Sequence, residues 1–396
     1  MNKDKKIFIA ADVFPPQMGG PATYSLNLAK HLHEKGYKVK ALVYGHLHQR
    51  KPKVKFSITK VSLRWPLPLR YFFYFIQLFF LSYNYDVIYA QGPVASGWPA
   101  FLVSRLTAKR LIVKIVGDYA WEQARLTHKT EQGIDDWQKN PKYKEVMVGK
   151  SRLLINMQKA VVKTADKVIV PSHYLKKIVV GWGAKEDSIE VIYNNVSLPD
   201  PVEASKGEVK QQISVSGNIL ISVGRLVPWK GFDFLIKLMP DLLKMNPEFK
   251  LIIIGDGPEL KEYQKIIQEL NLVEKVFLPG GMSQEKLLLY FKASDMFLLN
   301  TEYEGLSHVI LEAMFCNVPI IVSDMGGNPE IIDHEINGLL IEYNNKEEWL
   351  KAIKRIWEDE DNKLRTRLTS HPTPKLPCFN FDELVTRTLV VLLGED

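Results

Sequence analysis

Cysteine is scarce in this chain: its 396 residues include two, Cys316 and Cys378. Two cysteines cannot build the disulfide framework of a small secreted domain, and they fit a reducing compartment or simple core packing. The fold must therefore depend on a hydrophobic core, and a hydrophobic content of 46% is ordinary for one. The length predicts two or three domains.

Long hydrophobic runs are also missing. The most aromatic stretch, Tyr71–Leu81, has eleven residues, whereas a bilayer-spanning helix needs about 20. The apolar run at the N-terminus is too short for a signal-peptide core, so we expect a first strand there and a cytoplasmic protein. The aromatic stretch leaves two interpretations open: a helix buried against a sheet, or an interfacial membrane contact with Arg64 and Arg70 at the headgroup level.

Acidic residues are few in the first half. Residues 1–200 hold 31 lysines and arginines against 15 acidic residues, a net charge of +16, and residues 201–396 hold 21 and 30, a net charge of −9. A basic half suggests an anionic partner. No DNA- or RNA-binding motif accompanies the charge, so we predict no nucleic-acid partner and favour a membrane surface or a phosphorylated acceptor. A basic composition without any partner is the alternative.

The dinucleotide-binding fingerprint Gly-x-Gly-x-x-Gly is absent from the first loop, residues 14–21, which disfavours a dehydrogenase. That loop instead contains Gly19 and Gly20 and joins a strand to a helical pattern. Strand and helix patterns alternate up to residue 193, lapse over residues 194–216 and then restart. This alternation predicts an α/β protein with two parallel-sheet domains. We place the domains at 1–195 and 196–377, followed by a closing helical segment, 378–396.

The second domain contains the most informative stretch, Thr301–Met314. The pattern predicts the end of a buried strand, a loop that contains Glu304, and a helix. Glu312 is expected on this helix, outside the stripe of apolar residues that forms its buried face. Free amides at the start of such a helix attract phosphate. Two carboxylates beside them suit a ligand with hydroxyl groups on both sides of a phosphate, such as a sugar nucleotide. An ordinary solvated helix with two surface glutamates is the alternative.

Three further loops follow predicted strands of the same domain. The first carries Arg225 and Lys230, cations that can bind phosphate oxygens. The second, Gly255–Pro258, has glycines that clear space at a strand end, and the third, Ser323–Glu330, offers glycine amides and a helix cap at Asn328. Loops that each follow a parallel strand lie along one rim of the sheet, so we expect a single site there.

Taken together, these motifs resemble the family 4 retaining glycosyltransferases of the GT-B fold. The resemblance rests on Gly-Arg-Leu-x-x-x-Lys-Gly at 224–231, Gly-Asp-Gly-Pro at 255–258, two glutamates eight residues apart at 304 and 312, and Phe-Pro-Pro-x-x-Gly-Gly at 14–20. It implies two Rossmann-like domains that face each other across a cleft, with the last helix crossing back onto the first domain. It also implies a UDP- or GDP-sugar donor, a glycan or lipid-linked acceptor in cell-envelope or polysaccharide synthesis, and no catalytic metal or other cofactor.

The resemblance further assigns roles to residues. Arg225 and Lys230 would hold the diphosphate, Glu312 the ribose and Glu304 the donor sugar. Catalysis would then consist of positioning and charge stabilisation. The complete set of implied donor contacts is Gly19, Gly20, Gly224, Arg225, Lys230, Gly255, Gly257, Glu304, Gly305, Leu306, Ser307 and Glu312.

One departure concerns a histidine that many members carry after a middle strand of the first domain. The matching segments here, 89–93 and 115–118, contain none. Asp118 is our candidate for its catalytic role, and Gln91 is a second strand-end candidate. His308 is interpreted as a helix-surface residue. The alternatives are another GT-B enzyme, such as a nucleotide-sugar epimerase or hydrolase, and a non-catalytic protein that binds nucleotide sugars or docks on a membrane.

Overall fold

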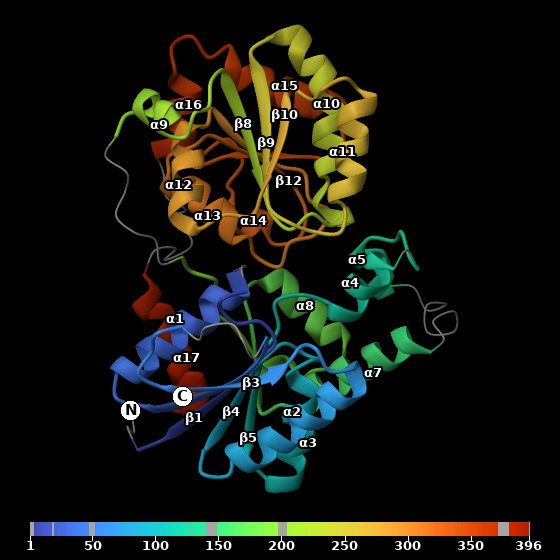
Figure 1. Ribbon diagram of the computed structural model, residues 1–396, viewed down its shortest axis with the longest axis vertical. Helices are drawn as coiled ribbons and strands as arrows, with labels where there is room; N and C mark the ends of the chain where they lie inside the picture. The colour runs from blue at the N-terminus through green and yellow to red at the C-terminus, as the bar shows by residue number, and fades with distance from the viewer. Residues whose placement is uncertain are drawn as a thin grey trace. The chain divides into compact units, whose positions relative to one another are not determined.

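The computed structural model describes residues 4–17, 20–46, 52–127, 129–139, 149–196, 204–370 and 380–395. The chain forms two compact units (Figure 1). Unit 1 comprises Met1–Tyr193 and Phe381–Asp396, and unit 2 comprises Asn194–Asn380. Each unit is built on one parallel sheet, so the predicted α/β class with two Rossmann-like domains is confirmed.

Unit 1 has a seven-stranded sheet in the order β3-β2-β1-β4-β5-β6-β7. Its strands are β1 (Lys6–Ala11), β2 (Lys38–Gly45), β3 (Ser57–Ser62), β4 (Val87–Gln91), β5 (Arg110–Lys114), β6 (Lys167–Val170) and β7 (Ile189–Val191). β1, β2 and β3 follow one another toward one edge of the sheet, and β4 to β7 follow one another toward the other edge. The strand order therefore switches between β1 and β4, which are parallel, hydrogen-bonded neighbours. In open α/β sheets such a switch point is where ligands bind, outside the carboxyl ends of the strands.

Helices cover both faces of this sheet. α1 (Gly20–Glu34) and α17 (Phe381–Leu393) pack together on one core, to which Leu28 and Leu384 belong. α2 (Leu67–Leu81) packs against α3 (Gly97–Thr107), which also contacts α7 (Lys150–Thr164). Over the described residues, the unit also contains the helices α4 (Tyr119–Leu126), α5 (Ile134–Lys139) and α8 (His173–Gly181) and the 3-10 turn η1 (Glu186–Ser188).

Unit 2 has a six-stranded sheet in the order β10-β9-β8-β11-β12-β13. Its strands are β8 (Asn218–Val223), β9 (Phe249–Ile254), β10 (Val276–Gly280), β11 (Met296–Leu299), β12 (Ile320–Ser323) and β13 (Leu339–Ile341). β8 and β11 pair in parallel at the centre. The loops that leave β8, β9, β11 and β12 therefore emerge from adjacent strands at the same edge.

The helices of unit 2 form a layer on each side of the sheet (Figure 1). α10 (Phe232–Met245), α11 (Leu260–Glu269) and α15 (Lys346–Trp357) share a core that includes Trp349. α9 (Lys206–Gln212), α12 (Gln284–Ala293) and α13 (His308–Phe315) lie on the other side. The short elements are η2 (Pro228–Lys230), α14 (Asn328–Ile331) and α16 (Lys363–Ser370).

Several elements differ from the sequence-based expectation. The polar stretch at 125–145 has no clear helical pattern in the sequence, yet it contains α5, whose Ile134 and Trp137 are buried one turn apart. The lapse at 194–216 contains α9, which begins with a capping box between Ser205 and Glu208. Edge strand β3 and helix α16 were not predicted either. Short elements with one or two buried apolar residues give too weak a periodic signal for recognition.

Candidate functional site

The loops after β8 and β9 are packed backbone to backbone. Leu226 N donates to Asp256 O at 3.0 Å. A Cβ on Gly255 would overlap the carbonyl of Gly224, and a Cβ on Gly257 would overlap that of Leu226. The predicted reason for these two glycines was space for a ligand. The structure shows a different one, since each makes room for the neighbouring loop.

The loops after β8 and β11 are joined as well. Glu302 N donates to Trp229 O at 2.8 Å, and Thr301 Oγ1 donates to the same carbonyl at 3.0 Å. These bonds bring the ammonium of Lys230 into contact with Oε1 of Glu304, with both side chains largely buried. A predicted phosphate ligand and a predicted sugar ligand are therefore adjacent, although they lie 74 residues apart in sequence.

The loop after β12 contacts the loop after β11 from the other side. Gly327 N donates to Glu304 O at 2.8 Å, so its amide is not open to a ligand, and that expectation was wrong. A Cβ on Gly326 would lie 2.7 Å from Glu304 N, which explains the glycine. Asn328 is the first residue of α14 and not its cap, because its buried side chain donates to Ser323 O at 3.0 Å.

The start of α13 lies directly beyond these contacts. Gly305, Leu306 and Ser307 are buried, and the Leu306 carbonyl accepts from Asn194 Nδ2 at 3.1 Å. Ser307 is the N-cap, yet its side chain makes no capping bond, and its buried Oγ has no hydrogen-bond partner among the described residues. A buried hydroxyl without a partner is uncommon in folded proteins. Together with the amides of the first helical turn, it suits a bound polar ligand.

Glu312 lies within α13 and is only 8% exposed, so the expectation that it stands away from the buried face was wrong. Its Oε1 accepts from Nε2 of Gln284, the first residue of α12, at 3.1 Å. Burial raises the pKa of Glu312 to about 7, and the hydrogen bond from Gln284 acts in the opposite direction. Sequence reasoning assigned no role to Gln284, and only its place one residue after the α12 cap could have drawn attention to it.

Arg225 and Gly224 lie on the loop that carries Lys230. The Arg225 side chain is exposed, and its backbone nitrogen is packed near Gly255. The structure thus brings Lys230 together with Glu304, and places Arg225, Ser307 and Glu312 on the loop and helices that adjoin this pair.

Unit 1 contains the other predicted residues. Gly19 lies outside the described residues, and Gly20 is the first residue of α1. Asp118 is fully buried and caps α4: Oδ1 accepts from Trp121 N at 3.0 Å and Gln158 Nε2 at 2.9 Å, and Oδ2 accepts from Gln138 Nε2 at 2.7 Å. Burial raises its pKa. This geometry gives Asp118 a structural role, and its contact with a sugar stays a prediction.

Gln91 ends β4, and its side-chain oxygen accepts from Ser25 on α1. Two polar residues at other strand ends were missed. Asp12 follows β1, and burial raises its pKa to about 7, while hydrogen bonds with Ser96 act in the opposite direction. Lys114 ends β5, burial lowers its pKa to about 7, and its Nζ lies 3.4 Å from the centre of the Tyr24 ring. The strand-end rule that selected Gln91 and Asp118 could have found both.

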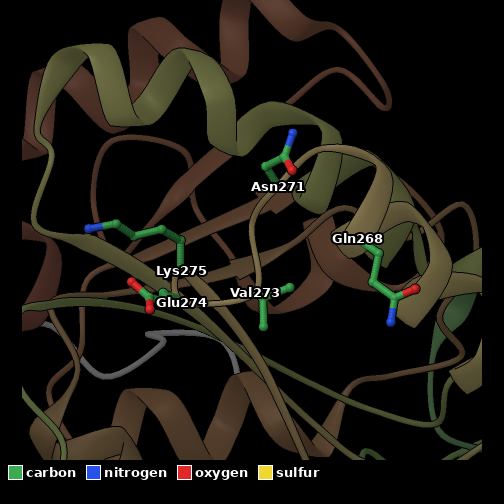
Figure 2. A pocket seen from close by; sticks show the side chains of 5 residues that line it. All are labelled: Gln268, Asn271, Val273, Glu274 and Lys275. Carbon is green, nitrogen blue, oxygen red and sulfur yellow. The ribbon is translucent and has the colours of Figure 1, made fainter.

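A separate hollow of about 420 Å³ lies on unit 2 (Figure 2). It is lined by Gln268, Asn271, Val273, Glu274 and Lys275. These residues lie at the end of α11 and in the loop that precedes β10, whereas the loops described above follow their strands. The hollow is therefore at the opposite edge of the sheet and contains none of the predicted site residues.

Over the described ranges, no group of three His, Cys, Asp or Glu side chains is arranged to hold a metal ion. An Asp-x-Asp sequence occurs at 359–361, between α15 and α16, where Asp359 accepts from Arg365 N at 2.8 Å and Asp361 pairs with Lys363 at 2.7 Å. Each helix within the residues that the structure describes is too short or too polar to cross a bilayer.

Two family models match the chain: Glycosyltransferase Family 4 over residues 18–198 and Glycosyl transferases group 1 over residues 205–371. The two matches together span both units, and the chain belongs to the group 1 and family 4 glycosyltransferases. Its two Rossmann-like units are those of the GT-B fold. It is 31% identical to an uncharacterized glycosyltransferase, MJ1607, of Methanocaldococcus jannaschii, over 49% of this chain and 51% of the relative.

The name of a second relative includes a diphospho-undecaprenol-linked acceptor. The chain is 27% identical to N-acetylgalactosamine-N,N'-diacetylbacillosaminyl-diphospho-undecaprenol 4-alpha-N-acetylgalactosaminyltransferase of Campylobacter jejuni, over 56% of this chain and 58% of the relative. The chain spans about half the length of these curated relatives. Among solved structures, HepE of Anabaena in complex with UDP-glucose superposes with a TM-score of 0.76 at 18% identity, covering 98% of this chain and 99% of HepE.

Proposed function

We propose that this protein is a retaining hexosyltransferase that moves a sugar from a UDP- or GDP-sugar to a glycan or lipid-linked acceptor in cell-envelope or polysaccharide synthesis. The observation that carries the proposal is the contact between Lys230 and Glu304 beside the start of α13. A cation, a carboxylate and a helix N-terminus in one place offer binding partners to the diphosphate and to the sugar of one donor.

Each donor group has a partner in unit 2. Lys230 and the exposed Arg225 take the diphosphate, the amides from Gly305 to Ser307 assist, and Glu304 accepts from the hydroxyls of the sugar. Glu312 accepts from the ribose. Because Lys230 and Glu304 touch each other in the structure, the donor exchanges one ion pair for two sets of contacts. HepE, which resembles the whole chain, binds UDP-glucose.

We propose the following reaction for a donor held at these positions. The bond between the sugar C1 and the diphosphate oxygen breaks, and the acceptor oxygen bonds to C1 from the same face. The acceptor proton passes to the departing phosphate oxygen, and Lys230 and Arg225 stabilise the negative charge that develops on the leaving group. The transfer needs no metal ion, so an excess of EDTA leaves the rate unchanged.

The first test is a thermal-shift screen against UDP-, GDP- and ADP-sugars, followed by transfer assays with the donor that binds. The stereochemistry at C1 of the product identifies retention. Incubation of that donor without acceptor separates the alternatives, since an epimerase converts the sugar and a hydrolase releases it rapidly. Equal product formation by wild type and by a variant with both Lys230→Ala and Glu304→Ala would refute the site.

The acceptor side of the proposal concerns α2. Most of this helix is apolar, yet only Tyr74 and Leu78 are buried. An exposed face runs along it at helical spacing through Leu69, Phe72, Phe73 and Phe80, and it continues past the end of the helix to Tyr83. Leu106 of α3 is also exposed. We name these six residues the aromatic face. The exposed Arg64 precedes α2, and the exposed Arg105 lies next to Leu106 in sequence. Arg70, the other arginine expected at the headgroups, donates to the backbone carbonyls of Leu63 and Trp65.

A helix that is apolar on all sides is normally enclosed by protein. Aromatic side chains flanked by arginines are typical of a membrane interface. With the net charge of +16 over residues 1–200, the aromatic face supports peripheral attachment to the anionic inner surface of the cell membrane, where a lipid-linked acceptor is located. Flotation with anionic vesicles at low salt tests attachment: the protein floats, and 0.5 M salt weakens the binding. A protein that stays at the bottom at low salt contradicts it.

A further inference from the structure

We propose that Gln284 is a positioning residue for nucleotide binding, which holds the carboxylate of Glu312 in the orientation and charge state that accept the ribose hydroxyls. The inference rests on the proposed function, because it deepens the role of the donor site in unit 2. It concerns a residue that touches Glu312 and has no other assigned role.

The geometry supports an orienting contact. Gln284 Nε2 donates to Glu312 Oε1 at 3.1 Å, and the two residues come from different helices, α12 and α13. Over the described residues, no other side chain bonds to this carboxylate. One carboxylate oxygen is therefore held by the protein, which fixes the direction of the second. Because a ribose offers two neighbouring hydroxyls, a fixed carboxylate loses less entropy on binding than a rotating one.

The same contact supports the charged form. Glu312 is 8% exposed, and burial raises its pKa to about 7. The amide of Gln284 is a donor, and a donor stabilises a carboxylate more than a carboxylic acid. Without it, a larger fraction of the protein would carry a protonated Glu312 at neutral pH, and a protonated carboxyl accepts from the ribose less well.

Several titratable groups lie on the two helices. On α13 and its C-terminal cap they are His308, one turn before Glu312, and the thiol of Cys316, one turn after it, whose raised pKa has Glu312 as its second cause. The adjacent α12 carries Glu285, Lys286 and Lys292. The pKa shift of Glu312 itself follows from burial and from Gln284. Strand β12, which also packs against α13, carries no ionisable residue.

The test is the pH dependence of nucleoside diphosphate binding, measured by calorimetry from pH 5.5 to 9 with UDP or GDP, whichever binds. The reference ligand is the 2′,3′-dideoxy form of the same nucleotide, which shares every phosphate ionisation but lacks the hydroxyls. For wild type, the affinity ratio of the two ligands falls about tenfold from pH 8 to pH 6, since a group with a pKa near 7 is about nine-tenths protonated at pH 6.

Gln284→Leu raises the midpoint of this ratio by about one pH unit, so its affinity for the ribonucleotide falls severalfold at pH 7 and recovers at pH 9. Gln284→Glu raises the midpoint as well, because a second carboxyl group disfavours the charge on Glu312. Glu312→Gln removes the pH dependence of the ratio. Glu285→Gln, a change at the exposed neighbouring position on α12, is the matched control and keeps the wild-type midpoint.

The outcomes separate the two proposals. A wild-type protein that binds no nucleoside diphosphate at any pH contradicts the proposed function. Wild-type binding with the same midpoint in Gln284→Leu and Gln284→Glu overturns the role of Gln284 and leaves the donor site intact. A ratio independent of pH in wild type also overturns it, because Glu312 would then make no contact with the ribose. A lower melting temperature alone cannot mimic a shifted midpoint.

Discussion

The two units share an architecture but differ in what their strand ends carry. In unit 2, the loops after β8, β11 and β12 are tied together by backbone contacts, and these bring Lys230 against Glu304. In unit 1, the carboxylate that follows β5 is Asp118. Both of its oxygens accept hydrogen bonds from the protein, and it caps α4. A strand-end position therefore indicates where a ligand can bind, but it does not show whether a polar residue there serves the ligand or the fold.

Charge separates the units in a second way. The chain carries a net charge of +16 over residues 1–200 and −9 over residues 201–396. In the acidic half, the two cations of the predicted site, Arg225 and Lys230, lie on one loop. In the basic half, the positive charge is spread over the sequence, and the aromatic face lies in that half. The first pattern suits one small anionic ligand, and the second suits an extended anionic surface.

The largest expected effect tests the strand-end contact of unit 2. Lys230→Ala lowers turnover at least about 100-fold, because loss of one group that stabilises developing charge has that effect in other enzymes. Arg225→Ala acts in the same direction. Lys237→Ala removes a mostly exposed lysine paired with Asp233 on α10 and serves as the matched control. Steady-state transfer rates of the three variants decide the question, and a Lys230→Ala rate close to that of the control would contradict the site.

The second prediction concerns the stability cost of Glu312. Its pKa is raised from 4.5 to about 7, so ionisation opposes folding: the penalty is absent below pH 4.5, grows up to about pH 7 and is complete above it. A shift of that size corresponds to at most about 3 kcal/mol. Glu312→Gln, which can still accept from Gln284, therefore stabilises unit 2 at pH 8 by about 1–3 kcal/mol.

Urea unfolding at pH 8 and at pH 4.5 measures this effect. The gain in the free energy of unfolding is present at pH 8 and absent at pH 4.5, while nucleotide affinity falls at pH 8. A variant that is less stable than wild type at pH 8 would show that the Glu312 carboxylate supports the fold, as Asp118 does in unit 1.

The third prediction asks whether Asp118 belongs to the fold or to the reaction. Asp118→Ala costs unit 1 about 2–3 kcal/mol, since a helix cap is lost and the amide donors of Gln138 and Gln158 lose their acceptor. Ser172→Ala removes the cap of α8, where Ser172 Oγ accepts from Leu175 N at 3.1 Å, and costs about 1 kcal/mol as a matched control. The hydrogen bonds to both carboxylate oxygens favour the structural role, so we expect turnover per folded molecule to stay near wild type in both variants. A selective loss of turnover in Asp118→Ala would instead confirm the predicted catalytic role.

Sequence reasoning recovered most of the fold because long elements repeat their signal. The alternation expected after residue 216 includes α10, Phe232–Met245, whose buried residues recur at helical spacing. The motif loops could be placed on one rim because they follow parallel strands. What the sequence could not show was the tertiary reason for single residues: Gly257 clears space for a neighbouring loop, and Gly327 uses its amide within the fold.

Burial of polar residues was equally hidden. Glu312 lies eight residues after Glu304 in a helix of mixed character, and periodicity placed it toward solvent, whereas packing of α12 against α13 encloses it. Its partner Gln284 is 28 residues away in sequence. A contact of this kind depends on the register between two helices, which no local pattern encodes.

The smallest effect on stability is expected at the aromatic face, where the contrast between the units is sharpest. Phe72 and Phe80 are 56% and 69% exposed, so replacing both with serine changes the free energy of unfolding by no more than about 0.5 kcal/mol per site. Binding to anionic vesicles falls about tenfold or more, because both rings otherwise leave water for the bilayer interface. Val273→Ser, at a position 64% exposed on unit 2, is the control and leaves vesicle binding unchanged. Equal loss in both proteins would mean that exposed apolar area in general, and not the aromatic face, determines attachment.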